Sequence, residues 1–218
     1  MPLTAVLFDL DGTLVDSVPG IYDAVSRVLE ELQIANCTPQ QVRDWVGNGS
    51  RNLMARAMGN DDPSTVQTAL NAFERHYSQT LMNTSLYPGV LEGLQQLQQA
   101  NIAMACVTNK ARAFTLPMLN VLGLSSYFNT VIGGDDMRQL KPAPAGLLHA
   151  CAALQVAHTD TIMVGDSAND LKAAQAAGIE SIAVSWGYPQ GESLVNYGPS
   201  LIVNSFAELT ETLLARRG

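Results

Sequence analysis

Cysteine is scarce in this chain of 218 residues, which contains only Cys37, Cys106 and Cys151. The number is odd, the three lie far apart, and none belongs to a Cys-x-x-Cys pair. This pattern argues against a disulfide framework and against a zinc site. Small buried thiols are the interpretation that remains, so the fold must be stabilised by its hydrophobic core.

Long apolar runs are also missing. No stretch approaches the roughly 18 apolar residues of a membrane-spanning helix, and the segment before Asp9 lacks the basic residues that begin a secretory signal. We therefore expect a cytoplasmic protein without a membrane partner. Apolar residues nevertheless make up 47% of the chain and charged residues 15%, a composition typical of a globular protein with a substantial core.

Basic residues are outnumbered by acidic ones, 12 against 20, and the formal net charge is −8. Nucleic-acid binding draws most of its affinity from basic patches, and the sequence contains no cluster of lysine and arginine. A nucleic-acid partner is therefore not expected. A protein of this charge that handles an anionic substrate must build a local positive site from a metal ion, a lysine or helix N-termini.

Short apolar runs rich in valine, isoleucine and leucine alternate with amphipathic segments along the chain. Near-continuous apolarity fits strands that are buried on both faces of a parallel sheet. The alternation of strand and helix predicts a doubly wound, Rossmann-like α/β core. The predicted strands cover residues 5–8, 102–107, 130–132, 161–164 and 181–184.

One connection breaks this alternation. About ninety residues separate the first two predicted strands, where a crossover normally needs only a few tens. The intervening segment opens with apolar residues at helical spacing and continues with helix-like stretches at 50–58 and 64–82. We therefore expect a helical cap domain over residues 17–84, inserted into a catalytic core formed by residues 1–16 and 85–218.

Four polar clusters each follow a predicted strand, and the carboxyl ends of parallel strands share one edge of a sheet, where ligands bind. The first cluster places Asp9 and Asp11 two residues apart, so their carboxylates project the same way while the strand lasts. Crowded carboxylates repel one another unless a divalent cation neutralises them, and an all-oxygen environment suits Mg²⁺. Gly12 allows the backbone to turn sharply and to approach a ligand closely.

The other three clusters supply hydrogen-bond donors, a cation and further acids. Thr108 and Asn109 offer a hydroxyl and an amide to phosphoryl oxygens, and Lys141 is suited to cancelling phosphate charge. Asp166 lies where a metal ligand is expected, and Asp170, one helical turn on, can orient Lys141 or a metal-bound water. Taken singly, each cluster also fits a helix N-cap or a surface charge. Together they indicate a phosphate site.

In this order, each at a strand end, the clusters resemble the four motifs of the haloacid dehalogenase superfamily, and the inserted segment resembles its helical cap. The resemblance implies a magnesium-dependent phosphatase that forms a covalent aspartyl-phosphate. It implies Asp9 as the nucleophile and Asp11 as the general acid and base, with Thr108 and Lys141 binding phosphate. The implied magnesium ligands are Asp9, Asp166 and the backbone carbonyl of Asp11.

Within the superfamily the chain most resembles the bacterial phosphoglycolate phosphatases, so 2-phosphoglycolate is the expected small-molecule substrate. One departure is the segment 186–191, where that group often carries a Gly-Tyr-Asn-Tyr-Gly type of sequence. The matching stretches are 46–50, 107–110, 131–136, 140–142 and 164–170.

The cap should select the leaving group, because the core motifs contact only phosphate and metal and bind every phosphate ester alike. Asn48, Gly49 and Arg51 are the expected substrate contacts, since glycine permits close backbone approach and arginine can bind a carboxylate. Arg43 is a further candidate. A helix N-cap at Ser50 would explain the same loop without any ligand.

Other functions share part of this pattern. Dehalogenases of the superfamily lack the second acid, so Asp11 argues against halide removal. A sugar-phosphate phosphatase, a pyrophosphatase or a phosphomutase would keep all four motifs, and substrate profiling would separate them. A phospho-receiver signalling module uses similar residues, but such modules are shorter and have no cap. The sequence is compatible with a monomer or a small homo-oligomer.

Overall fold

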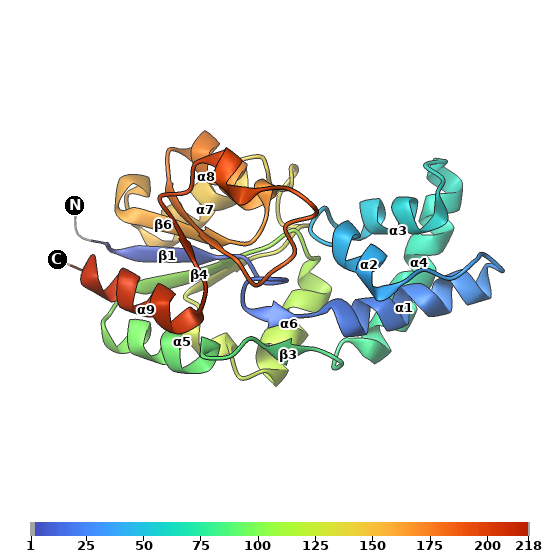
Figure 1. The fold of residues 1–218 in the computed structure, drawn as a ribbon, viewed down its shortest axis with the longest axis horizontal. Helices are drawn as coiled ribbons and strands as arrows, with labels where there is room; N and C mark the ends of the chain where they lie inside the picture. Colours follow the sequence, from blue (N-terminus) through green and yellow to red (C-terminus); the bar gives the residue numbers. More distant parts are fainter. Residues whose placement is uncertain (1–2, 218) are drawn as a thin grey trace.

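A computed structural model describes residues 3–217. Its main sheet contains β1 (Ala5–Phe8), β4 (Ala103–Val107), β5 (Thr130–Ile132), β6 (Thr161–Gly165), β7 (Glu180–Val184) and β8 (Leu201–Val203). All neighbouring strands are parallel, in the order β5-β4-β1-β6-β7-β8 (Figure 1). The predicted doubly wound α/β core is therefore confirmed, with β1 between β4 and β6.

Helices cover both faces of this sheet. In Figure 1, α7 (Ala145–Leu154) and α8 (Ala168–Ala177) lie above it, and α5 (Val90–Gln99) and α9 (Phe206–Ala215) lie below it. Strand β1 is fully buried between the two layers: Val6 and Phe8 enter one hydrophobic core, and Leu7 enters the other. Apolar side chains on both faces explain why the sequence of β1 is continuously apolar.

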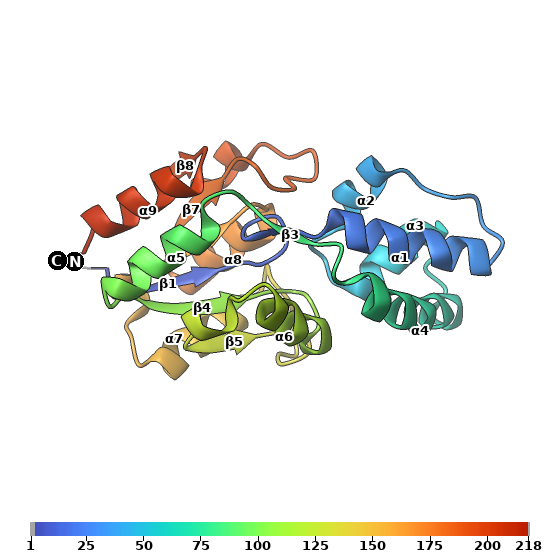
Figure 2. The same ribbon diagram turned by 90° about the horizontal axis from the view of Figure 1, so that it is seen from below.

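A second group of helices lies beside the carboxyl edge of the sheet (Figure 2). The group consists of α1 (Val18–Glu31), α2 (Pro39–Trp45), α3 (Ser50–Met58) and α4 (Pro63–Thr80). These helices pack against one another, with α1 in contact with the other three. The chain enters and leaves the group through an antiparallel ribbon of β2 (Val15–Asp16) and β3 (Ser85–Leu86).

The remaining elements are short connections and one longer helix. Strands β1 and β5 and helix α3 begin and end where the sequence predicts, whereas β8 and the β2–β3 ribbon are absent from the prediction. None of the helices within residues 3–217 has the length and apolarity needed to cross a membrane. The further helices are α6 (Arg112–Val121), η1 (Ser125–Tyr127), η2 (His158–Asp160) and η3 (Leu194–Tyr197).

Candidate active site

The strand-end residues singled out in the sequence meet at one edge of the sheet. Asp9 follows β1, Thr108 follows β4 and Asp166 follows β6, which are three adjacent strands. Lys141 comes from the connection between β5 and α7, and Asp170 lies in the first turn of α8. All five residues are buried. The fold thus converts separate sequence clusters into one polar site.

Lys141 is the cation at the centre of this site. Its Nζ donates hydrogen bonds to Asp170 Oδ1 at 2.7 Å and to the carbonyl oxygen of Val107 at 2.6 Å. It also lies 2.9 Å from Asp9 Oδ1, an ion pair by distance without hydrogen-bond geometry. Burial lowers the pKa of Lys141, but attraction by Asp170 and Asp9 outweighs burial and raises this pKa above its usual value. The ammonium therefore stays charged.

Three carboxylates surround that single ammonium. One oxygen atom of each of Asp9, Asp166 and Asp170 lies within 4.8 Å of the others. Burial raises the pKa of Asp9 to about 6 despite the opposing effect of Lys141. Burial, followed by repulsion from Asp170 and Asp9, raises the pKa of Asp166 well above its usual value. The single positive charge of Lys141 does not neutralise three carboxylates. This all-oxygen donor set fits a hard divalent cation.

Hydrogen bonds hold these acids in place. Asp170 Oδ2 accepts from the backbone N–H and the hydroxyl of Ser167, at 3.1 and 2.7 Å. Asp166 accepts from the hydroxyl of Thr13 at 3.0 Å and from the backbone N–H of Tyr188 at 2.6 Å. A Cβ atom at Gly12, where φ is +87°, would lie 2.1 Å from Asp166 Oδ2. Only glycine fits this close approach.

The side-chain amide of Asn109 forms hydrogen bonds to other residues of the protein. Its Nδ2 donates to the carbonyl oxygens of Gly47 and Lys141, both at 2.9 Å, and its Oδ1 accepts from the backbone N–H of Lys141 at 2.8 Å. An amide nitrogen has two hydrogens, so these bonds leave none for a phosphoryl oxygen. Asn109 lines the pocket but ties Lys141 to the loop before α3.

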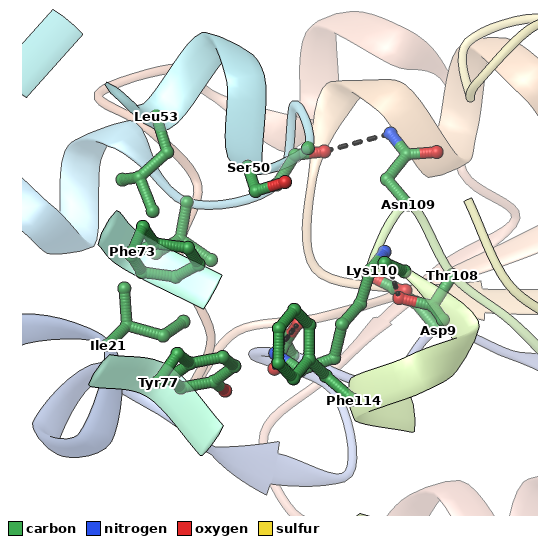
Figure 3. A pocket seen from close by; sticks show the side chains of 15 residues that line it. Asp9, Ile21, Ser50, Leu53, Phe73, Tyr77, Thr108, Asn109, Lys110 and Phe114 are labelled. Atoms are coloured by element: carbon green, nitrogen blue, oxygen red, sulfur yellow. Dashed lines mark hydrogen bonds and ion pairs between the residues drawn. The ribbon is translucent and has the colours of Figure 1, made fainter. Parts of the chain in front are cut away.

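A pocket of about 530 Å³, part of it open to solvent, separates this polar floor from helices α1, α3 and α4 (Figure 3). The core contributes polar side chains to it, and the helices contribute mainly aliphatic and aromatic ones. The lining residues are Asp9, Asp11, Thr108, Asn109, Lys110, Ala111 and Phe114 from the core, and Ile21, Val46, Gly47, Gly49, Ser50, Leu53, Phe73 and Tyr77 from the helical group.

The loop before α3 rests on the core. The carbonyl oxygen of Gly47 accepts from Asn109 and from Asn169, and the Asn48 side chain donates to Gln190 Oε1 at 3.2 Å. Asn48 Oδ1 accepts from Asn169 at 3.0 Å. Of the predicted cap contacts, Gly49 lines the pocket, whereas Asn48 points to the core surface and joins the two parts of the molecule.

Arg51 is not brought to the pocket. Its guanidinium donates to Gln67 Oε1 on the neighbouring helix α4, and the residue is exposed. Arg43, the other candidate arginine, donates to the carbonyl oxygen of Gly187 at 3.3 Å and lies 4.7 Å from the centre of the Tyr188 ring. Both arginines therefore make contacts within the protein.

Two residues at the site have no role in the sequence interpretation. Lys110 Nζ donates to both carboxylate oxygens of Asp11 at 3.0 Å. Tyr188, besides its backbone bond to Asp166, donates from its hydroxyl to Asp16 Oδ1 at 2.5 Å. Lys110 directly follows the Thr108–Asn109 pair, and Tyr188 lies shortly after β7. The strand-end rule, applied to more residues after β4 and to β7, would have pointed to both.

Comparisons with known proteins agree on one family. Residues 6–184 match the family described as haloacid dehalogenase-like hydrolase. The phosphoglycolate phosphatase of Nitrosospira multiformis is 39% identical over 98% of this chain and 96% of its own length, and that of Colwellia psychrerythraea is 40% identical over 95% and 96%. A predicted phosphoglycolate phosphatase from Haemophilus somnus 129PT superposes with a TM-score of 0.91 at 28% identity, covering 96% of this chain and 97% of its own.

Proposed function

Because the chain belongs to the haloacid dehalogenase-like hydrolases, and is thereby a phosphoric monoester hydrolase, we propose that it converts 2-phosphoglycolate to glycolate and phosphate through an aspartyl-phosphate on Asp9. The observation that carries this proposal is the position of Asp9. Its buried carboxylate lies 2.9 Å from Lys141 and lines a pocket that is walled by helices on the opposite side. A nucleophile, a fixed cation and a pocket with space for a leaving group thus occur together.

In the first step, Asp9 would attack phosphorus as the bond from phosphorus to the ester oxygen breaks. Lys141 would bind phosphoryl oxygens, and Thr108, which lines the same pocket, would donate a hydrogen bond to them. Asp11 also lines the pocket and would give a proton to the departing alkoxide. Phosphoryl transfer depends mainly on such positioning and on charge neutralisation.

In the second step, Asp11 would accept a proton from water as the water oxygen attacks phosphorus and the bond to Asp9 breaks. Asp9, Asp166 and the backbone carbonyl of Asp11 would hold a magnesium ion, and Asp170 would keep Lys141 in position through its 2.7 Å hydrogen bond. The bound ion would supply the positive charge that keeps Asp9 ionised and balances the phosphoryl oxygens.

Residues 17–84 would act as the cap domain, with the β2–β3 ribbon as its connection to the core. The cap provides most of the pocket's apolar wall and contacts the core through the loop at Gly47 and Asn48. Closure over a substrate would exclude water from the reacting groups, as lids do in other enzymes. A small ester such as 2-phosphoglycolate would fit beneath such a cap.

The test is a panel of phosphate esters assayed with Mg²⁺ for phosphate release. We expect many turnovers and the highest kcat/KM for 2-phosphoglycolate. A preference for hexose phosphates would favour a sugar-phosphate phosphatase, release from pyrophosphate would favour a pyrophosphatase, and phosphate transfer between positions of one sugar would favour a mutase. Release of at most one equivalent would contradict enzymatic hydrolysis and favour a receiver module.

A further inference from the structure

Lys110 brings a cation to the lining of the pocket, whereas Lys141 lies outside that lining. Its backbone is held on both sides: the N–H donates to the Thr108 hydroxyl at 3.2 Å, and the carbonyl oxygen accepts from the N–H of Gly134 at 2.8 Å. Its Nζ donates to both oxygens of Asp11 at 3.0 Å, and its side chain is 6% exposed. The ammonium is therefore fixed beside the carboxyl group that would give its proton to the leaving group.

The surroundings of this ammonium are apolar. Nζ lies 4.8 Å from the centre of the Tyr77 ring, and Phe73 and Phe114 line the same part of the pocket (Figure 3). Among the described residues that line the pocket, Lys110 is the only cation. Apolar walls lower the local dielectric and strengthen the attraction of one charge for an anion. Burial lowers the pKa of Lys110, but Asp11 outweighs burial and raises it, so the charge persists.

Tyr77 provides a second, independent observation at the same place. Its hydroxyl is buried and has no hydrogen-bond partner among the described residues, and the residue, 1% exposed, lines the pocket. Burial raises the pKa of Tyr77 to about 12, so the hydroxyl keeps its proton. A buried O–H group without an acceptor is unfavourable, and an acceptor on a bound ligand would relieve that cost.

We propose that Lys110 and Tyr77 form the subsite for the carboxylate of the leaving group, which makes the enzyme selective for phosphate esters of small hydroxy acids. An ammonium has three donors, and Asp11 takes two of them. The third, together with the free Tyr77 hydroxyl, can bind a carboxylate. This inference rests on the proposed function and assigns its specificity to residues outside the four motifs.

The subsite also joins the two parts of the molecule. Lys110 belongs to the core, and Tyr77 belongs to α4 of the helical group. A carboxylate held by both would bridge cap and core directly above the reacting phosphate, so the same contact that selects the substrate would favour the closed arrangement. An ester with a neutral leaving group would offer no negative charge to either donor, so both contacts would be weaker.

The experiment compares 2-phosphoglycolate with 2-hydroxyethyl phosphate, which has the same two-carbon chain and phosphate but a neutral hydroxymethyl group in place of the carboxylate. The measured quantity is the ratio of their kcat/KM values. Lys110→Met should lower the wild-type ratio about 10- to 100-fold, the range for a hydrogen bond to a charged group. Any disturbance of Asp11 or of phosphate binding acts on both substrates and cancels in the ratio.

Tyr77→Phe is the matched second variant, because it removes one oxygen whose proton has no acceptor among the described residues. It should keep the fold and lower the ratio about 3- to 10-fold, as expected for a neutral donor. An unchanged ratio in Lys110→Met would overturn the subsite while leaving the proposed function intact. If Lys110→Met does not fold, an unchanged ratio in Tyr77→Phe overturns the proposed subsite. A wild type without preference for 2-phosphoglycolate overturns both proposals.

Discussion

The floor and the wall of the pocket are built in opposite ways. The floor is formed by Asp9, Asp11 and Thr108. It is supported by Lys141, Asp166 and Asp170, which are buried and each hold at least two polar contacts at fixed distances. On the wall, Phe73 and Leu53 are apolar, and the chemistry is confined to a few polar groups. The floor is suited to the phosphoryl group common to all substrates, and the wall to the part that differs between them. Substitutions on the floor should therefore lower activity for every substrate, whereas substitutions on the wall should change the preference between substrates and have smaller effects.

The largest effect is expected from Asp9→Asn. An amide cannot serve as the nucleophile, so kcat should fall for every phosphate ester, by about 10⁶-fold as for other lost covalent nucleophiles. Steady-state phosphate release by the purified variant measures this loss. Circular dichroism should match that of the wild type, and substantial residual turnover would contradict the covalent mechanism.

Asp11→Asn should have the next largest effect, about 10²- to 10⁴-fold. The same carboxyl group would donate a proton in the first step and accept one in the second, so both steps should slow. Rapid-quench measurement of aspartyl-phosphate formation and decay separates them. Unchanged rates for both steps would remove Asp11 from this role, whereas slow formation alone would limit it to the acid.

The metal ion and the pH should change the free energy of unfolding through the carboxylates of the site. Chelation should abolish turnover and Mg²⁺ should restore it. In chelator, the pKa of Asp9 lies at about 6 in the folded protein against an ordinary 3.8, so between these values the folded state binds more protons than the unfolded chain. The contribution of Asp9 to the free energy of unfolding should therefore fall as pH rises from 4 to 6.

Urea unfolding of wild type and Asp9→Asn measures this contribution together with the effect of Asp9 on the pKa of Asp166, since asparagine does not titrate. Both proteins are measured in EDTA at pH 4, 5 and 6. The wild type should lose stability relative to the variant as pH rises, and Mg²⁺ at pH 7 should stabilise the wild type by about 2.7 kcal/mol at one hundred times its dissociation constant. A constant difference between the two proteins would contradict the raised pKa.

The floor could be predicted from the sequence because strand ends determine it. Asp9, Thr108 and Asp166 each follow a buried apolar run, and a parallel sheet brings such positions to one edge whatever the details of packing. Asn109 lines the pocket, but whether its amide is available to a substrate depends on its hydrogen bonds to Gly47 and Lys141, which the folded backbone determines. No sequence pattern gives those bonds.

The wall could not be predicted in the same way. Its residues come from helices α1, α3 and α4, and the side of each helix that faces the pocket depends on how the helices pack on one another and on the core. Arg51 illustrates this: it is one residue from Ser50, which lines the pocket, yet its side chain extends to Gln67. Neighbours on a helix differ by about 100° in direction, so an error of one residue changes the surface that a side chain reaches.

The smallest effects should come from the contact between cap and core. Gln190 donates from Nε2 to the carbonyl oxygen of Val46 and accepts from Asn48 at 3.2 Å. Gln190→Ala removes both bonds and should lower kcat/KM about 5- to 30-fold, because two bonds at roughly 0.5–1 kcal/mol each add up to about 1–2 kcal/mol. If the loop docks in the same way for every substrate, as the proposed closure requires, kcat/KM should fall equally for 2-phosphoglycolate and for 2-hydroxyethyl phosphate.

Arg51→Ala is the matched control for Gln190→Ala, since it truncates a long polar side chain in the same region without touching the loop's contact with the core. Its guanidinium pairs with Gln67 at the surface, where such contacts contribute little, so both kcat/KM values should stay within about two-fold of wild type. A selective loss for 2-phosphoglycolate in Arg51→Ala would mean that the arginine turns into the pocket when substrate binds, and the carboxylate would then be read by the cap alone. Equal losses in Gln190→Ala, with none in Arg51→Ala, would instead leave selection to groups that already face the pocket.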